Sequence, residues 1–144
     1  MTIDTETLFA AAKDVQAKAH ARYSNYCVGA AILDETDRVH VGCNVENASF
    51  PETSCAEANA IGAMVSSGAR KIVAIAIVGG MGNQAKNALF ESAGDLGACT
   101  PCGGCRQRIL EFADESTQIM LIGNDGEMQT FSIDELLPSA FRVE

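Results

Sequence analysis

The chain has 144 residues, the size of one ordinary globular domain and too short for two catalytic domains. Hydrophobic residues make up 47% and charged residues 20%, so the chain can bury a core and is neither disordered nor fibrous. The formal net charge of −9, with no run of Lys or Arg, argues against a polynucleotide substrate, because a phosphate backbone would be repelled.

The compartment follows from what the sequence lacks. Its apolar stretches fall short of the about 20 residues needed to cross a bilayer. Residues 1–6 lack the basic flank and apolar region of a secretory signal. We therefore expect a cytoplasmic protein without a membrane partner. In a reducing compartment, the six cysteines are better candidates for metal ligation or burial than for disulfides.

The first half of the chain predicts a helix, a hairpin and a second helix. Apolar residues at helical spacing indicate a helix over about residues 4–21. Two strands, over 28–33 and 39–46, flank a polar turn and form the hairpin. An alanine-rich run that begins at Cys55 and stops before Gly68 predicts the second helix.

A buried strand, a long loop and a third helix follow. The β-branched run at 71–78 predicts a strand, and residues 79–98 have no clear period and are expected to form a loop. Pro101 precedes Cys102, and proline is favoured at a helix start. The third helix is therefore expected to begin at Cys102.

The last predicted elements are a hairpin and a short helix. Strands at 118–122 and 128–131 flank an Asn-Asp-Gly turn, and Ser132 with Glu135 forms a capping-box pair. Together the elements predict one α/β domain over residues 1–144. We expect about five strands in this domain, with helices on both faces of the sheet.

Two short cysteine clusters stand at predicted helix starts, Cys55-Ala56-Glu57 and Pro101-Cys102-Gly103-Gly104-Cys105. A helix N-terminus favours the thiolate, which is the form that binds metal. Cys102 and Cys105 are three residues apart on one helical face, a spacing that fits a tetrahedral zinc ion. The three thiols therefore predict a Zn²⁺ site with three protein ligands. Its fourth position is left to water, as in catalytic zinc sites.

Glu57 is the candidate general acid/base, because a carboxylate beside an activated water can take its proton and pass it to a leaving group. An alternative is a closed, structural four-cysteine site that includes Cys99, which would leave Glu57 without a role. Another alternative is burial of all the cysteines, which does not account for the C-x-x-C spacing. Cys27 and Cys43, on predicted strands, are expected to be core residues.

The combination of Cys-Ala-Glu with Pro-Cys-x-x-Cys resembles the signature of zinc nucleoside deaminases. The similarity extends through residues 23–26, 28–31, 44–48, 105–107 and 136–141. Over nearly the whole chain the sequence is similar to the short, homotetrameric cytidine deaminases. This resemblance implies a three-layer α/β/α cytidine deaminase-like fold with a mixed sheet of about five strands. It also implies a Zn²⁺ cofactor and a homotetramer with shared active sites.

The resemblance also implies a hydrolase acting on a C–N bond of a cyclic amidine, in pyrimidine salvage. Zinc-bound hydroxide would attack C4 of cytidine or 2′-deoxycytidine, and Glu57 would move the protons. Ammonia would leave, giving uridine or 2′-deoxyuridine.

Substrate contacts are implied by the same resemblance. Asn44 and Glu46 would hold the ribose 3′-hydroxyl, Tyr26 would lie near the base, and Ala56 would offer main-chain contacts to the pyrimidine. Tyr23 would be a further substrate-binding residue. From the residues alone, the first two side chains share one strand face, which also fits a solvated surface.

The chain end and one helix position need separate mention. The resemblance implies that Phe141 reaches into a neighbouring subunit's site, whereas from the residues alone it would plug its own domain. Ala58 stands where many relatives carry Arg or Gln. The helix dipoles and Arg106 would then have to balance the charge of the thiolates.

Two other functions stay open at this level. One is a deaminase of another aminated heterocycle, such as blasticidin S or a free base. The other is an oligomeric binding protein with structural zinc. Metal content together with ammonia release from cytidine separates the three hypotheses.

Overall fold

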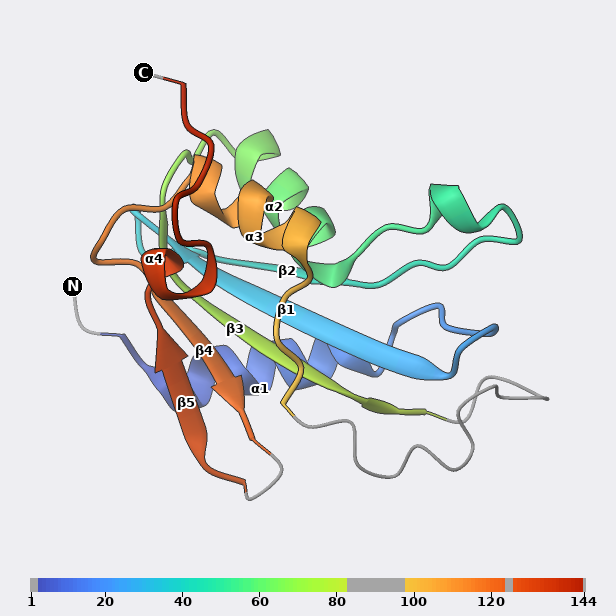
Figure 1. The fold of residues 1–144 in the computed structure, drawn as a ribbon. Helices are drawn as coiled ribbons and strands as arrows, with labels where there is room; N and C mark the ends of the chain where they lie inside the picture. The colour runs from blue at the N-terminus through green and yellow to red at the C-terminus, as the bar shows by residue number, and fades with distance from the viewer. Residues whose placement is uncertain (1–2, 83–97, 124–125, 144) are drawn as a thin grey trace.

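A five-stranded mixed sheet in the order β2-β1-β3-β4-β5 organises the chain (Figure 1). The computed structural model describes residues 3–82, 98–123 and 126–143. β3 and β4 are parallel, and the other neighbouring strands are antiparallel. The strands are β1 (Tyr26–Asp34), β2 (Val39–Cys43), β3 (Ile72–Met81), β4 (Gln118–Ile122) and β5 (Met128–Phe131).

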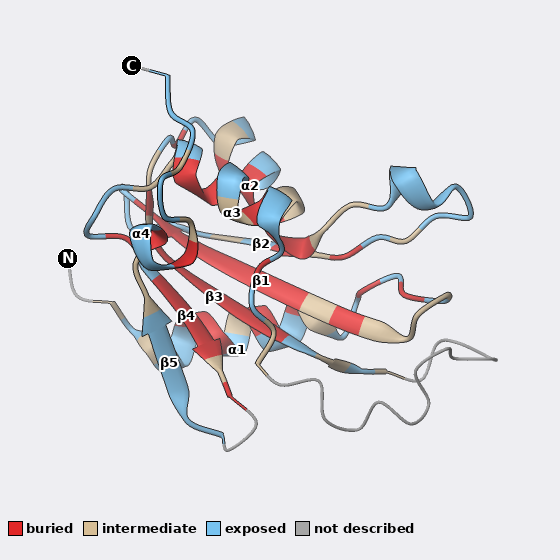
Figure 2. Ribbon diagram, viewed as in Figure 1, coloured by how far each residue is buried: buried red, intermediate tan, exposed pale blue. Residues whose placement is uncertain are grey.

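Helices cover both faces of this sheet, so the predicted three-layer α/β/α fold is confirmed (Figure 1). One buried cluster lies between the sheet and α1, and the other lies between the sheet and α2 with α3 (Figure 2). Within the described part, every helix is too short or too polar to span a bilayer. The helices are α1 (Thr5–Gln16), α2 (Ala56–Ser66), α3 (Gly103–Glu111), α4 (Ile133–Leu136) and a 3₁₀ turn, η1 (Phe50–Glu52).

Several predicted boundaries are corrected. The first helix ends at Gln16 rather than near residue 21, and β2 ends at Cys43, three residues before the predicted end. The predicted loop at 79–98 is wrong at its start, because β3 continues to Met81 by pairing with Tyr26 of β1. The remainder of that loop, 83–97, and Asn124-Asp125 of the predicted turn lie outside the described residues.

Other local predictions are confirmed. The strands at 118–122 and 128–131 have the expected ends, and Ser132 and Glu135 form the capping box. Both capping hydrogen bonds are present at the start of α4. These signals lie within a few residues of one another, so they depend little on the rest of the fold.

Gly42 sets the height of α2 above the sheet. A Cβ atom at Gly42 would lie 2.3 Å from the Ala60 nitrogen and 2.5 Å from the Ala56 carbonyl oxygen. The absence of a side chain therefore allows the first turns of α2 to rest directly on β2. This contact fixes the position of the Cys55-Ala56-Glu57 segment.

Asp34 organises the turn between β1 and β2. Its fully buried carboxylate accepts hydrogen bonds from the Thr36 N–H at 2.7 Å and the Arg38 N–H at 3.1 Å, and lies 2.6 Å from His40 Nε2. Burial disfavours the charged form, but the hydrogen bonds from His40, Thr36 and Arg38 outweigh it and hold the pKa of Asp34 below its usual range.

Candidate active site

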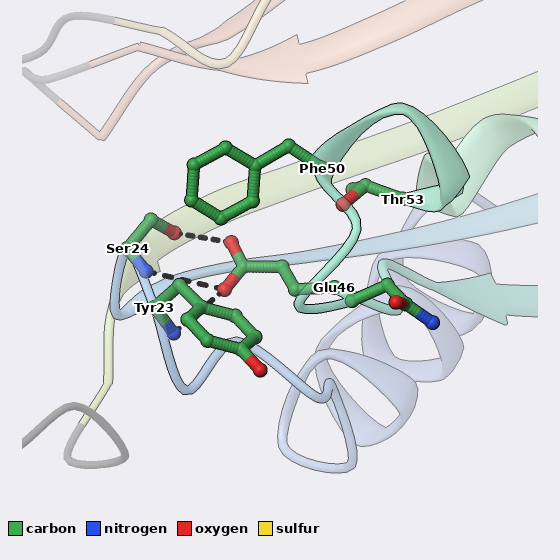
Figure 3. Close-up of a pocket in the computed structure, with 6 residues that line it drawn as sticks. Tyr23, Ser24, Glu46, Phe50 and Thr53 are labelled. Carbon is green, nitrogen blue, oxygen red and sulfur yellow. Dashed lines mark hydrogen bonds between the residues drawn. The ribbon is translucent and has the colours of Figure 1, made fainter.

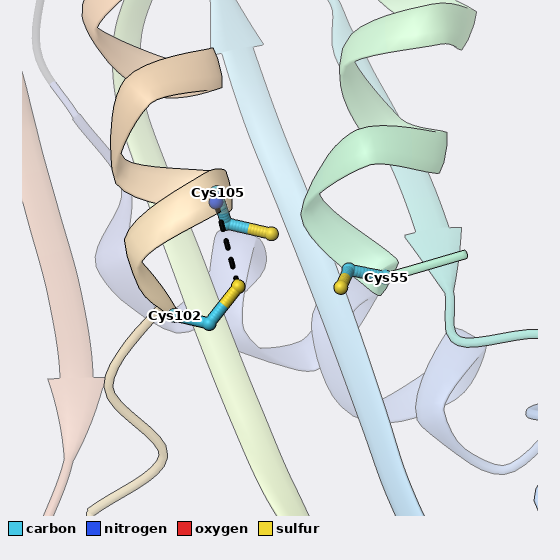
Figure 4. Close-up of side chains that lie close together, drawn as sticks. All are labelled: Cys55, Cys102 and Cys105. Atoms are coloured by element: carbon cyan, nitrogen blue, oxygen red, sulfur yellow. Dashed lines mark hydrogen bonds between the residues drawn. The ribbon is translucent and has the colours of Figure 1, made fainter. Parts of the chain in front are cut away.

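The starts of α2 and α3 lie side by side and bring three cysteines together (Figure 4). Cys55 is the N-cap residue of α2, Cys102 is the N-cap residue of α3, and Cys105 lies in the first turn of α3. Their sulfur atoms all lie within 4.8 Å of one another. The Cys105 N–H donates a hydrogen bond to the Cys102 sulfur at 3.4 Å, which fixes the turn between them.

The donor set fits a zinc ion. Tetrahedral zinc–sulfur bonds of about 2.3 Å place sulfurs about 3.8 Å apart, so the cluster needs only a small closure. The unpaired N–H groups at the two helix starts favour negative charge on the sulfurs. The three cysteines expected from the sequence are therefore the three that the fold brings together.

The thiols of Cys55 and Cys105 are linked by a hydrogen bond. This bond lowers the pKa of Cys55, because it stabilises the thiolate that accepts it, and raises the pKa of Cys105, the donor. The hydrogen bond therefore favours the thiolate at Cys55 and the thiol at Cys105. The thiolate is the form of cysteine that binds a metal ion.

Glu57 lies against this cluster from the first turn of α2. Its side chain is only 5% exposed. Burial raises the pKa of the carboxyl group, while the hydrogen bond to Cys105 and the charge of Arg108 act in the opposite direction. A carboxyl group in this setting can hold a proton and release it, as a general acid/base must. Ala56, almost fully buried, lies between Glu57 and Cys55 in the chain.

Cys99 does not belong to the cluster, so the closed four-cysteine site is wrong. The Cys99 thiol is instead hydrogen-bonded to the Tyr26 hydroxyl. A Cβ atom at Gly79 would lie 2.5 Å from that hydroxyl oxygen and 2.7 Å from the Cys99 sulfur. Burial, followed by the bond to Cys99, raises the pKa of Tyr26. The negative charge of Glu57 contributes to this upward shift of the pKa of Tyr26.

The other two cysteines lie on the strands. Cys27 is buried together with Ala19 and Ala21, and Cys43 packs against this group. The prediction that both are core residues is confirmed for Cys27, and Cys43 is half-buried.

Glu46 anchors a turn at the edge of a small pocket (Figure 3). Its carboxylate accepts hydrogen bonds from the Tyr23 N–H at 2.9 Å, from the Ser24 N–H at 3.1 Å and from the Ser24 hydroxyl. Burial disfavours the charge, but these bonds hold the pKa of Glu46 below its usual range. The rings of Tyr23 and Phe50 meet edge to face, with centroids 6.0 Å apart. The pocket of about 220 Å³ is lined by Tyr23, Ser24, Glu46, Asn47, Phe50 and Thr53.

Asn44 braces the backbone beside the cysteine cluster. Its side-chain oxygen accepts a hydrogen bond from the Val28 N–H at 2.9 Å, and its side-chain nitrogen donates to the Tyr26 carbonyl oxygen at 2.8 Å. The interpretation as a solvated strand face is therefore wrong for this buried residue. Val45, the residue after Asn44, forms an antiparallel bridge with Ser54, which precedes Cys55 in the chain.

Phe141 is 73% exposed, so it does not plug its own domain. The Gln107 side chain of α3 donates a hydrogen bond to the Phe141 carbonyl oxygen at 3.1 Å. Arg106 donates to the carbonyl oxygens of Pro101 and Leu136, both at 2.7 Å. The C-terminal segment is thus tied to the helix whose N-cap is Cys102, and Phe141 stays largely exposed on the protomer.

Sequence reasoning missed two features of the site. It did not find the Ser24 hydrogen bonds to Glu46, for which no local signal exists, because the two residues are 22 positions apart. It also named Arg106 as the nearby cation, whereas Arg108 is the arginine whose charge acts on Cys55 and Glu57. The helical spacing of four residues between Gly104 and Arg108 was the available signal.

The chain is similar in sequence and in fold to several cytidine deaminases. The profile of the family "Cytidine and deoxycytidylate deaminase zinc-binding region" matches residues 2–121. A cytidine deaminase of Sporosarcina psychrophila is 36% identical over 142 residues, which cover 99% of this chain and 94% of the relative. A cytidine deaminase of Mycoplasma genitalium is 34% identical over 99% of this chain and 98% of the relative.

Two solved structures extend the comparison to three dimensions. The crystal structure of cytidine deaminase from Burkholderia pseudomallei matches this chain with a TM-score of 0.81 and 35% sequence identity. The match covers 96% of this chain and 100% of the Burkholderia chain. The crystal structure of cytidine deaminase from Mycobacterium tuberculosis has a TM-score of 0.77 and 33% identity, over 99% of this chain and 100% of the other.

Proposed function

The chain belongs to the zinc-dependent cytidine deaminase family and is an enzyme that hydrolytically deaminates cytidine, and we propose that Cys55, Cys102 and Cys105 hold its zinc and that Glu57 transfers the protons. The observation that carries this assignment is the meeting of three sulfurs at two helix starts, with a buried carboxyl group against them. Residues 1–144 form one deaminase domain in this proposal.

Zinc, when bound, supplies a Lewis acid that makes water a nucleophile at neutral pH. The protein supplies the rest of the chemistry. The Glu57 carboxylate accepts a proton from the attacking water and delivers it to the amino group that leaves C4 as ammonia. Because Glu57 is buried, its proton is shielded from exchange with bulk solvent during this transfer.

Substrate orientation rests on the residues around the cluster. We propose that Asn44 and Glu46 bind the ribose 3′-hydroxyl. Tyr26 would lie beside the base, and Tyr23 would lie beside the sugar. The hydrogen bonds of Asn44 and Glu46 to the backbone hold both side chains rigid, which supports a role in positioning. Ala56, at the first position of α2, offers a main-chain N–H that has no acceptor within the helix. Cytidine and 2′-deoxycytidine are both substrates in this assignment.

We further propose a homotetramer in which each active site receives Phe141 from a neighbouring subunit. The exposure of Phe141, together with exposed Val39, Val41 and Phe50, supports burial against another copy. A closed symmetric assembly allows every site to receive such an aromatic residue. Cytoplasmic pyrimidine salvage is the proposed setting of the reaction.

Ammonia release measured in parallel tests the function. The substrates are cytidine, 2′-deoxycytidine, 5-methylcytidine, cytosine, adenosine, guanine and blasticidin S, with zinc content determined on the same sample. We expect release from the two cytidine nucleosides with one equivalent of uracil nucleoside formed. Release only from blasticidin S or a free base would overturn the nucleoside assignment, and full zinc without any release would indicate a binding protein.

A further inference from the structure

Arg108 folds back toward the start of its own helix, over Gly104. A Cβ atom at Gly104 would lie 2.9 Å from Arg108 Nη1 and 4.0 Å from the Cys102 sulfur. The guanidinium group thus occupies the space that a side chain at Gly104 would take. Helical side chains lean toward the N-terminus, and a residue four positions later is a neighbour on the same face.

This geometry places a cation beside the metal ligands. The two distances limit the separation of Arg108 Nη1 from the Cys102 sulfur to about 7 Å, a range over which unit charges interact appreciably. The guanidinium group of Arg108 therefore lies within electrostatic range of a cysteine at the start of α3.

The cluster has a charge that needs such a partner. Three thiolates outweigh the two positive charges of Zn²⁺, and the Glu57 carboxylate adds further negative charge in a buried setting. The whole chain has a formal net charge of −9, so it has no overall excess of positive charge to offset this cluster. Ala58, next to Glu57, is uncharged, and the Arg106 side chain is held by the Pro101 and Leu136 carbonyl oxygens.

We propose that Arg108, seated over Gly104, is the charge-compensating residue of the zinc site and strengthens zinc binding by the three cysteines. This inference rests on the metal site assigned above. Arginine suits the role because its guanidinium group keeps its positive charge at all working pH values. Its effect is electrostatic, since it donates no ligand atom to the metal.

The test is zinc affinity, measured by competition with a chromogenic zinc chelator at low salt and at 1 M NaCl. We expect Arg108→Gln to bind zinc about threefold to tenfold more weakly at low salt, an effect reduced by the exposure of the side chain. Arg108→Lys should keep part of the affinity. The difference in zinc affinity between wild type and Arg108→Gln should become smaller at 1 M NaCl. Salt screens the effect of a charge but not the effect of a packing defect.

Gly104 and Gly103 provide a matched pair of variants. Gly104→Ala pushes the guanidinium group aside and should weaken zinc binding when Arg108 is present. In the Arg108→Gln background, the same substitution should cause no further loss of zinc affinity. Gly103→Ala has no atom within 4 Å of its new methyl group and should leave the affinity unchanged.

Two results would overturn the proposal. One is an unchanged zinc affinity in Arg108→Gln, and the other is a loss that stays the same at high salt, which would indicate packing. Failure of the wild-type protein to bind zinc would instead contradict the metal site itself. Far-UV circular dichroism of each variant verifies that the fold is retained.

Discussion

Replacing Gly42 by alanine should separate α2 from the sheet and disturb the active site from a distance. The added Cβ atom would lie 2.3 Å from the Ala60 nitrogen, whereas ordinary contacts begin at 3.4 Å. Relief of this clash needs a displacement of about 1 Å, and both obstructing atoms belong to the helix backbone, so a rotamer change cannot provide it. The whole start of α2, with Cys55 and Glu57, has to move.

The expected loss is about 1–3 kcal/mol in the free energy of unfolding, the usual cost of overpacking a core. A shift of about 1 Å at catalytic groups costs about 100-fold in rate, so kcat/KM for cytidine should fall by that order. Urea denaturation gives the first quantity, and ammonia release gives the second.

Gly62 in the same helix supplies the control. A methyl group at Gly62 meets no atom within 4 Å, and alanine is favoured over glycine inside a helix. Gly62→Ala should therefore raise the free energy of unfolding by about 0.5–1 kcal/mol and leave the enzyme's activity unchanged. A Gly42→Ala enzyme with wild-type stability and rate would refute the argument that this contact sets the height of α2.

Three further predictions concern other parts of the molecule. Asp34→Asn should lower the free energy of unfolding by about 1–3 kcal/mol at pH 7, measured by urea titration. Folding lowers the pKa of Asp34 from its unfolded-state value of about 4. The stability advantage of wild type over Asp34→Asn should therefore disappear as the pH falls from about 4 toward the lower folded-state pKa. An equal difference in the free energy of unfolding at acid pH would contradict the assignment. Glu46→Ala should weaken inhibition by the product uridine about tenfold or more while changing inhibition by uracil little, since only uridine carries the sugar; equal losses would indicate a purely structural role. Mixtures of Phe141→Ala with Glu57→Gln subunits should regain activity, because hybrid assemblies contain sites without either defect. Activity equal to the sum of the two variants, despite subunit exchange, would rule out shared sites.

The cysteine cluster was predictable because its signals are local. Cys102 and Cys105 are one helical turn apart, and a helix start at Cys55 follows from composition over a few residues. Apart from the resemblance to deaminases, the sequence did not predict that the starts of α2 and α3 lie next to each other. The fold brings them together by laying α2 and α3 side by side on one face of the sheet.

The misplaced boundaries depend on contacts between distant residues. Gly79 and Gly80 weaken the strand signal at the end of β3, yet pairing with β1 carries the strand to Met81. In the same way, the apolar alternation past Cys43 suggested a longer β2, whereas the chain there leaves the ladder and forms single bridges to His20 and Ser54.

Side-chain roles around the site were the least predictable. In the sequence Asn44 resembled a surface residue, because the alternation of a strand predicts which face of the sheet a side chain lies on. It does not predict which backbone groups lie close enough to form hydrogen bonds with that side chain. Its hydrogen bonds to the backbone of Val28 and Tyr26 become visible only when β1 and β2 are placed side by side. The choice of Arg108 over Arg106 likewise depends on the path of each side chain along α3.

The most direct test of the account compares the zinc-loaded Glu57→Gln enzyme with wild type. Zinc content, uridine formation and ammonia release from cytidine are measured on the same preparations. We predict one zinc per chain in both proteins and a loss of at least about 100-fold in turnover for Glu57→Gln, because an amide cannot carry the proton. Near-normal turnover with the zinc retained would contradict the central claim that Glu57 moves the protons at the three-cysteine site.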